Sequence, residues 1–181
     1  MLGTEGSRGL THPRVDKHAD VPPGTTSYYF RTRQALLRGV AERVSVLDLA
    51  DLSMMDEHSD RFRHEYSGTL GLARLVMLSG TEPYLTRTRA RFELILQSRK
   101  DPELAVATQS YSTGLFGLAT DVIARWLDEQ HICDSSVEQR AVVILTFIAG
   151  VMTSFVQGNP VVSDAGHLDQ MIRQILHNSA A

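Results

Sequence analysis

Apolar side chains recur every three to four residues along most of this chain, a spacing that predicts α-helices with one buried face. After two short segments near the N-terminus, the pattern predicts six longer helices that end at proline, glycine or polar breaks: 33–52, 61–78, 83–99, 102–130, 136–157 and 164–177. The polar stretch 53–60 is expected to be a loop. No segment alternates polar and apolar residues as a half-buried strand does, so we expect an all-α fold.

A tight break separates the two short segments. Pro22, Pro23 and Gly24 cannot continue a helix, because proline lacks the amide hydrogen and biases the residue before it out of the α region. Thr11 suits the N-cap of the first segment, which we expect over 11–19. The second restarts over 23–30, because proline is tolerated in a first helical turn. Two short helices joined by such a turn form a DNA-binding unit, whose second helix enters the major groove.

The second segment, GTTSYYF, is hydroxyl-rich at its start and aromatic at its end. Amides at a helix start attract phosphate, and hydroxyl groups bond phosphates or base edges. The composition predicts a helix whose start meets DNA and whose far end packs on the protein. The alternative is a surface pair of helices with its tyrosines packed on a core.

The stretch from 11 to 37 resembles the N-terminal signature of the tetracycline-repressor (TetR) family of bacterial transcription regulators. The family signature has a capping threonine, an Ala-Gly-Val turn, a recognition helix with Gly-Thr-x-Tyr-x-Phe, a basic residue and a leucine-rich fourth helix. The matching residues here are Thr11, Val15, Ala19, Val21, Gly24, Thr25, Tyr28, Phe30, Arg33, Leu36 and Leu37. The resemblance implies a helix-turn-helix domain over 1–44 and a helical ligand-binding and dimerisation domain over 45–181.

Three features depart from the family pattern. Asp16 stands where a small apolar residue is usual, and Asp20 replaces the glycine of the turn. Only MLGTEGSRGL precedes Thr11, where family members have a longer amphipathic helix, so we expect a DNA-binding domain that lacks most of its first helix. Met1 and Leu2 would be the remnant of that helix, and its loss would expose apolar surface.

The resemblance also implies which side chains meet DNA. We expect phosphate contacts from Thr11, Tyr28 and Arg33, and base contacts from Pro23, Thr25, Thr26 and Tyr29, with Arg14 and Gly24 completing the interface. Charge distribution agrees, although the net charge of −3 alone argues against nucleic acid. Residues 1–44 hold seven basic and four acidic side chains, a charge of +3 that leaves −6 on the remainder.

The last two predicted helices carry more apolar surface than one core needs. Such helices at a chain end favour pairing with a second copy in a four-helix bundle, although a monomer core is the alternative. The predicted dimer interface comprises Ile144, Ile148, Val151, Phe155, Leu168, Ile172 and Ile175. A dimer would present two recognition helices to a near-palindromic DNA operator.

The resemblance further implies a small-molecule effector, of unknown chemistry, enclosed by the middle helices. Candidate walls, each of which could equally be plain core, are Tyr66, Met77, Phe92, Leu96, Tyr111, Phe116 and Phe147. We therefore expect a repressor that an effector releases from its operator. The alternative is a dimeric ligand- or protein-binding module that does not hold DNA, because its first helix is absent.

Enzyme and membrane classes find little support in the sequence. There is no HExxH, nucleophile elbow or phosphate loop, and one cysteine with seven scattered histidines builds no metal motif, so we expect neither catalysis nor a cofactor or metal. No apolar run reaches the ~18 residues of a membrane span. The single cysteine, Cys133, fits a reducing cytoplasm.

Overall fold

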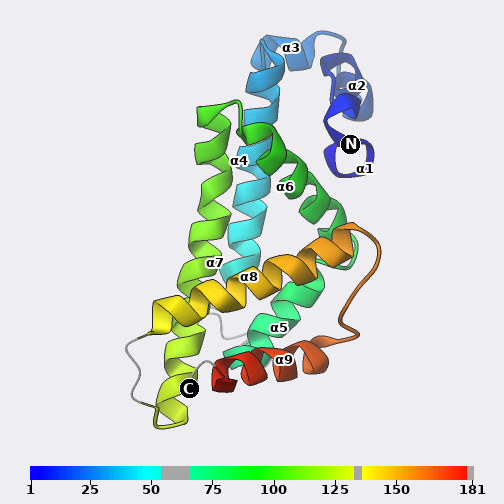
Figure 1. Ribbon diagram of the computed structural model, residues 1–181. Helices are drawn as coiled ribbons and strands as arrows, with labels where there is room; N and C mark the ends of the chain where they lie inside the picture. The colour runs from blue at the N-terminus through cyan, green and yellow to red at the C-terminus, as the bar shows by residue number, and fades with distance from the viewer. Residues whose placement is uncertain (54–65, 133–135, 179–181) are drawn as a thin grey trace. The chain divides into compact units, whose positions relative to one another are not determined.

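The protein is described by a computed structural model that covers residues 1–53, 66–132 and 136–178, and these residues form helices without a strand (Figure 1). The all-α prediction is therefore confirmed. The helices are α1 (Leu2–Gly9), α2 (His12–His18), α3 (Thr25–Tyr29), α4 (Arg33–Leu52), α5 (Gly68–Leu78), α6 (Tyr84–Ser98), α7 (Pro102–Glu129), α8 (Val137–Val156) and α9 (Ala165–Asn178). The predicted loop after 53, the predicted helix start at 61 and Cys133 lie outside the described residues.

The chain forms two compact units. The first contains residues 1–48 and 86–111, and the second contains 49–85 and 112–181. These boundaries differ from the predicted division at 44 and 45, because residues 86–111 pack with the N-terminal residues. As a division of function, the predicted boundary stays a prediction.

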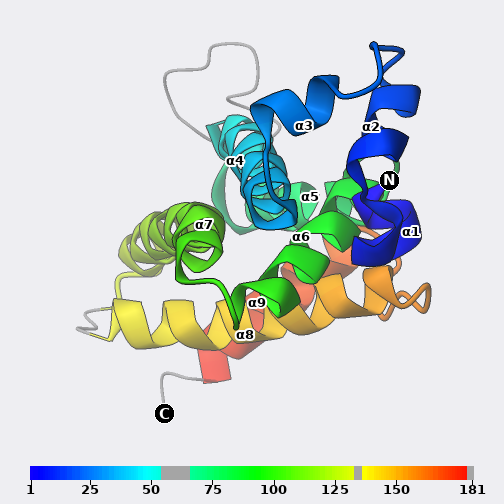
Figure 2. The same cartoon turned by 90° about the horizontal axis from the view of Figure 1, so that it is seen from above.

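The core of the first unit includes the residues before the helix-turn-helix. Leu2 and Leu10, at the two ends of α1, are 6% and 4% exposed, and they belong to one buried cluster with residues of α4, α6 and α7. Figure 2 shows α1 beside α6. The close approach explains Gly3, since a Cβ there would lie 1.9 Å from the carbonyl oxygen of Thr86. The short N-terminal segment, kinked at Gly6, thus supplies core side chains to this unit.

Two ion-pair clusters tie α4 to other helices of the first unit. Asp48, only 1% exposed, accepts two hydrogen bonds from Arg91 of α6, with Nε–Oδ2 at 2.7 Å and Nη2–Oδ1 at 2.6 Å. Arg87 joins it, with Nε 3.0 Å from Asp48 Oδ1. Because all three side chains are largely removed from water, each charge depends on its partner.

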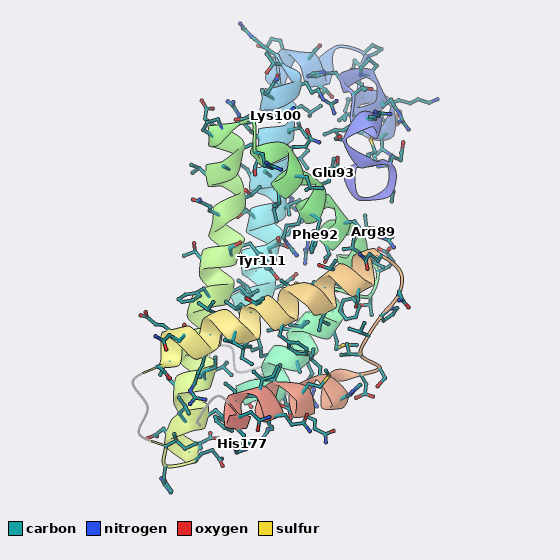
Figure 3. All side chains as sticks on the ribbon, viewed as in Figure 1. Arg89, Phe92, Glu93, Lys100, Tyr111 and His177 are labelled. Carbon is teal, nitrogen blue, oxygen red and sulfur yellow. The ribbon has the colours of Figure 1, made fainter. Side chains whose placement is uncertain are left out.

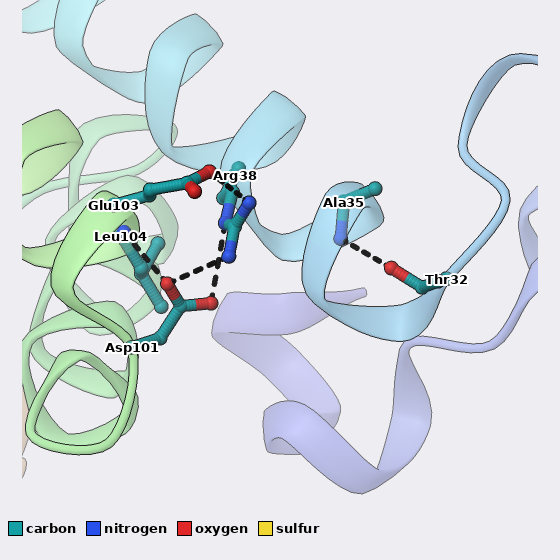
Figure 4. A network of polar contacts seen from close by, with 6 residues as sticks. All are labelled: Thr32, Ala35, Arg38, Asp101, Glu103 and Leu104. Carbon is teal, nitrogen blue, oxygen red and sulfur yellow. Dashed lines mark hydrogen bonds and ion pairs between the residues drawn. The ribbon is translucent and has the colours of Figure 1, made fainter.

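The second cluster lies where α7 begins. Arg38 of α4 donates to both oxygens of Asp101, at 3.2 and 2.9 Å, and also contacts Glu103 (Figure 4). Asp101 accepts the amide hydrogen of Leu104 as well, at 3.1 Å, and so caps α7. The hydrogen bonds from Arg38 hold the pKa of the Asp101 carboxyl below its usual value.

The core of the second unit is formed by apolar faces of α5, α8 and α9. Leu72, Ile144, Leu168 and Ile172 have no exposed surface, and α9 packs on both α5 and α8. The guanidinium of Arg140, in the first turns of α8, donates to the carbonyl oxygen of Leu176 at 2.5 Å. By length and composition α8 is the one described helix that could cross a membrane, with a mean hydropathy of 1.7, but a buried core helix has the same character.

The residues predicted at a dimer interface lie inside this core. Of the seven, all but Ile175 are at most 4% exposed within a single chain: Ile144, Ile148, Val151, Phe155, Leu168 and Ile172. Their own chain covers most of each of these six side chains, and their part in a dimer interface stays a prediction. Periodicity revealed a buried face but not which segment covers it.

Candidate nucleic-acid interface

The turn between α2 and α3 depends on two residues with left-handed backbone. Asp20 has a φ of 53° and Gly24, the N-cap residue of α3, has a φ of 92°. Glycine adopts this conformation at no steric cost, and aspartate is one of the few other residues that tolerate it. The sequence departure at Asp20 therefore preserves the backbone that the turn requires. Figure 2 shows α2, this turn and α3 leading into α4.

Asp16 holds the start of α3 in place. Its side chain, on α2, is 4% exposed. It accepts the amide hydrogens of Gly24 and Thr26 at 2.8 and 2.7 Å, and the hydroxyl of Thr26 at 2.5 Å. These hydrogen bonds, above all the one from the Thr26 hydroxyl, hold the pKa of the Asp16 carboxyl below its usual value. Asp16, which departs from the family pattern, thus lies on α2 and caps the start of α3 with its side chain.

This geometry corrects the role predicted for Thr26. The residue is 6% exposed and its hydroxyl is committed to Asp16, so it anchors α3 and does not face outward as a base reader. The sequence could not show this, because the partner Asp16 lies ten residues earlier in the chain, on the other side of the turn.

Arg33 has a structural role in addition to its predicted phosphate contact, which stays a prediction. One terminal nitrogen donates to the carbonyl oxygen of Leu10 at 2.8 Å, and the other donates to that of Ser7. These carbonyls belong to the end of α1, where helical carbonyls have no partner within the helix. Arg33 therefore ties the start of α4 to α1 through two of its donors, while its side chain stays exposed. Arg14 pairs with Glu5 of α1 and remains half exposed.

The aromatic end of α3 has one partly buried and two exposed side chains. Phe30 packs on α4 at Gly39, where a Cβ would come within 2.4 Å of Phe30 Cε1. Tyr28 and Tyr29 are 76% and 73% exposed, and their rings meet edge to face at 5.2 Å between centroids. The expectation that the far end packs on the protein is correct for Phe30 and wrong for the tyrosines, which are accessible to a partner.

The outward side of α2 and α3 contains a hollow of about 540 Å³. Its lining includes the predicted Pro23 and Gly24, and also Lys17, Ser27 and Arg31, which the sequence-based set of contacts did not include. All five are exposed. Lys17 and Arg31 supply positive charge beside the first turn of α3, where phosphate binding is favoured. Their charge was visible in the sequence, but their place beside α3 required the fold.

Two other predicted contacts lie close by. Thr11 is the N-cap residue of α2 and is partly buried, without a capping hydrogen bond from its side chain. Thr25 opens α3, and its hydroxyl donates to the carbonyl oxygen of Pro22 at 2.6 Å. Their roles in DNA contact stay predictions.

The seven side chains predicted to enclose an effector are divided between the two units. Phe92, Leu96 and Tyr111 belong to the first, and the other four belong to the second. Leu96 is 66% exposed, so it is not part of a closed core. The ring of Tyr111 lies 3.9 Å from the guanidinium carbon of Arg91 (Figure 3), so it packs on the buried ion-pair cluster of this unit. All seven assignments as pocket walls stay predictions: Tyr66, Met77, Phe92, Leu96, Tyr111, Phe116 and Phe147.

Within the described ranges, no three histidine, cysteine, aspartate or glutamate side chains gather closely enough to hold a metal ion. No family profile and no curated protein matches the sequence.

Solved structures do match, over nearly the whole chain. A proposed TetR-family transcriptional regulator from Rhodococcus aligns with a TM-score of 0.70 at 17% identity, covering 99% of this chain and 93% of its own. A TetR-family member from Streptomyces coelicolor gives 0.69 at 18% identity, with 96% and 90% covered. The multidrug binding protein EbrR, solved with proflavin, gives 0.59 at 21% identity, with 96% and 92% covered. This chain therefore has the all-α fold of the TetR-family transcriptional regulators.

Proposed function

We propose that this protein is a DNA-binding transcriptional regulator of the TetR type, acting in the cytoplasm as a repressor that a small-molecule effector releases from its operator. The observation that carries the proposal is the anchored α3. Asp16 and Phe30 hold its two ends on the protein, while Tyr28 and Tyr29 stay open. A short helix fixed at both ends, with an exposed side and basic neighbours, is the geometry that reads a major groove.

The basic neighbours define the expected contacts. Lys17 and Arg31 are placed to bond phosphates beside the start of α3. Pro23, Thr25 and Tyr29 are the proposed base contacts, with Tyr28 bonding phosphate. Arg33 fixes α4 to α1 and, because it is exposed, keeps its proposed phosphate contact.

We also propose a homodimer, through a face of α8 other than the one first predicted. Val142, Thr146 and Ala149 are exposed and spaced so that they lie along one side of the helix. Val143 and Gly150 are exposed as well, so small and apolar side chains dominate this side. Close approach of two helices favours such residues. A dimer places two copies of α3 about one DNA turn apart, roughly 34–36 Å.

Release by a small molecule is supported by the fold, since a protein with the same fold, EbrR, was solved with proflavin bound. Repression is proposed over activation, because blocking a promoter needs no further contact with polymerase.

Selection of bound duplexes from a random library tests the proposal. The expected product is a near-palindromic sequence with half-sites about 10 base pairs apart. Thr25→Ala and Tyr29→Phe should relax the preference at individual positions, by about 1–3 kcal/mol for each hydrogen bond to a base that is removed. Ser98→Ala, at the end of α6, is the matched control and should select the wild-type sequence. Failure to enrich any sequence, from a protein that is folded and dimeric, would favour the alternative of a module that does not hold DNA.

A further inference from the structure

A second hollow lies entirely within the second unit. Its volume is about 400 Å³, and it is lined by residues from the start of α5, from the last turns of α7 and from α9. It shares no residue with the candidate DNA interface or with the predicted effector walls. Its walls combine a helix N-terminus, a buried hydroxyl, two arginines and a tryptophan.

The start of α5 supplies backbone donors to this hollow. The N-cap residue is Ser67, whose side chain makes no capping hydrogen bond. The first amides of a helix have no partner within it and carry its partial positive charge. Gly68 has a φ of 61°, and a Cβ at Gly71 would lie 2.2 Å from the backbone carbon of Tyr66. These two glycines let the chain turn tightly at the point where the donors lie.

Thr69 provides an independent indication of a ligand. It lines the hollow and is 2% exposed, and its hydroxyl oxygen has no hydrogen-bond partner in the described part of the chain. Native proteins satisfy nearly all buried polar atoms. A hydroxyl left without a partner in the wall of a hollow points to a polar group that enters from outside the chain.

The charged side chains of the wall favour an anion. Arg125 and Arg173 line the hollow together with one acid, Glu129, so the charges sum to +1. Arg173 is held in orientation by Asp169, with Nε–Oδ2 at 2.9 Å. Arg125 donates from Nε to the carbonyl oxygen of Asp121 at 3.3 Å. A guanidinium in fixed orientation is suited to bind carboxylate or phosphate.

An apolar wall completes the hollow. Val122 and Trp126, both on α7, are 1% and 4% exposed. The indole ring of Trp126 is fixed edge to face against His177 of α9, at 4.9 Å between centroids. A rigid aromatic wall beside a cationic one suits a molecule that has both an apolar and an anionic part.

We propose that this hollow binds a small organic oxyanion. Its carboxylate or phosphate group is bound by the first amides of α5, by the Thr69 hydroxyl and by Arg125 and Arg173. Its apolar part lies against Val122 and Trp126. The proposed site does not depend on DNA binding, so it can be tested separately from the proposed regulator function.

Tryptophan fluorescence gives a direct test, because Trp126 is the only tryptophan in the chain. The full chain is titrated separately with benzoate, with inorganic phosphate and with benzamide, the neutral analogue of benzoate. The expected result is a saturable change with benzoate or phosphate and none with benzamide. A response to benzoate alone identifies an aryl carboxylate as the preferred form, and a response to phosphate alone identifies a phosphate group.

Variants separate binding from folding. Thr69→Val keeps the shape and removes the hydroxyl, so it should weaken anion binding about tenfold or more while the anion-free protein melts at the same temperature or higher. Arg173→Gln should weaken binding similarly, and Arg43→Gln, an exposed arginine of α4, should not. If no anion produces a saturable change, if benzamide binds as benzoate does, or if Thr69→Val and Arg173→Gln both keep full affinity, the proposal is overturned.

Discussion

Replacing Asp48 by asparagine should destabilise the first unit strongly. Asp48 is 1% exposed and its two oxygens face Arg91 and Arg87, whose side chains are 9% and 15% exposed. Asparagine keeps the size but loses the charge and one acceptor, and it directs an amide donor at guanidinium donors. Removing one partner of a buried ion pair lowers the free energy of unfolding by about 3–5 kcal/mol. For a chain of this length, that lowers the melting temperature by about 6–20 °C.

Thermal unfolding followed by circular dichroism measures the effect. Glu42→Gln is the matched control, because Glu42 is an exposed acid on the same helix, and its melting temperature should change little. In a double-mutant cycle with Arg91→Met, the two losses should not add, since removal of Arg91 also removes the charge that Asp48→Asn leaves unpaired. A melting temperature for Asp48→Asn within 2 °C of the wild type, or strict additivity in the cycle, would refute the assignment of Asp48 as the partner on which Arg91 depends.

Two further predictions concern α3. Gly39→Ala places a Cβ 2.4 Å from Phe30 Cε1, so it should displace Phe30 and raise amide hydrogen exchange in α3. Gly117→Ala is the control, because open space surrounds Gly117 and the change should be neutral or stabilising. Equal exchange in both variants would argue against the packing of Phe30 on Gly39. Because the folded-state pKa of Asp16 is depressed, its hydrogen bonds to Gly24 and Thr26 persist above pH 3.8 and are lost only as the pH falls through that lowered value. The amide shifts of both residues, followed by NMR, should therefore titrate with a midpoint below 3.8, and a midpoint at or above it would contradict the account.

Local signals predicted the helices well, because the residues that end a helix act on their own neighbours. Pro22, Pro23 and Gly24 mark the break between α2 and α3, although α2 ends at His18 and α3 begins at Thr25, two residues later than predicted. The role of Asp16 could not be found in this way. Its partner Thr26 lies ten residues further along the chain, and only the fold of the turn brings them together.

Sequence alone could not identify the surface that covers a buried helix face. The stripe that contains Ile144, Ile148 and Val151 is buried, as its periodicity indicates, but the cover comes from the same chain. The pattern of apolar residues in one sequence predicts which helix face is buried, but it does not identify the segment that covers this face. The sequence likewise shows Arg33 as a basic residue close to α3. Its hydrogen bond to the carbonyl oxygen of Leu10 joins segments 23 residues apart, so it required the fold.

The most direct test of the regulator account is the salt dependence of duplex binding by the full chain. A fluorescently labelled random-sequence duplex is titrated by anisotropy at several salt concentrations. The wild type should bind, with log affinity falling linearly against log salt, and Lys17→Ala and Arg31→Ala should each reduce the slope by about 0.9. Arg43→Ala should leave the slope unchanged. Absence of binding at low salt, or a slope that neither Lys17→Ala nor Arg31→Ala alters, would contradict a DNA-binding surface on α2 and α3.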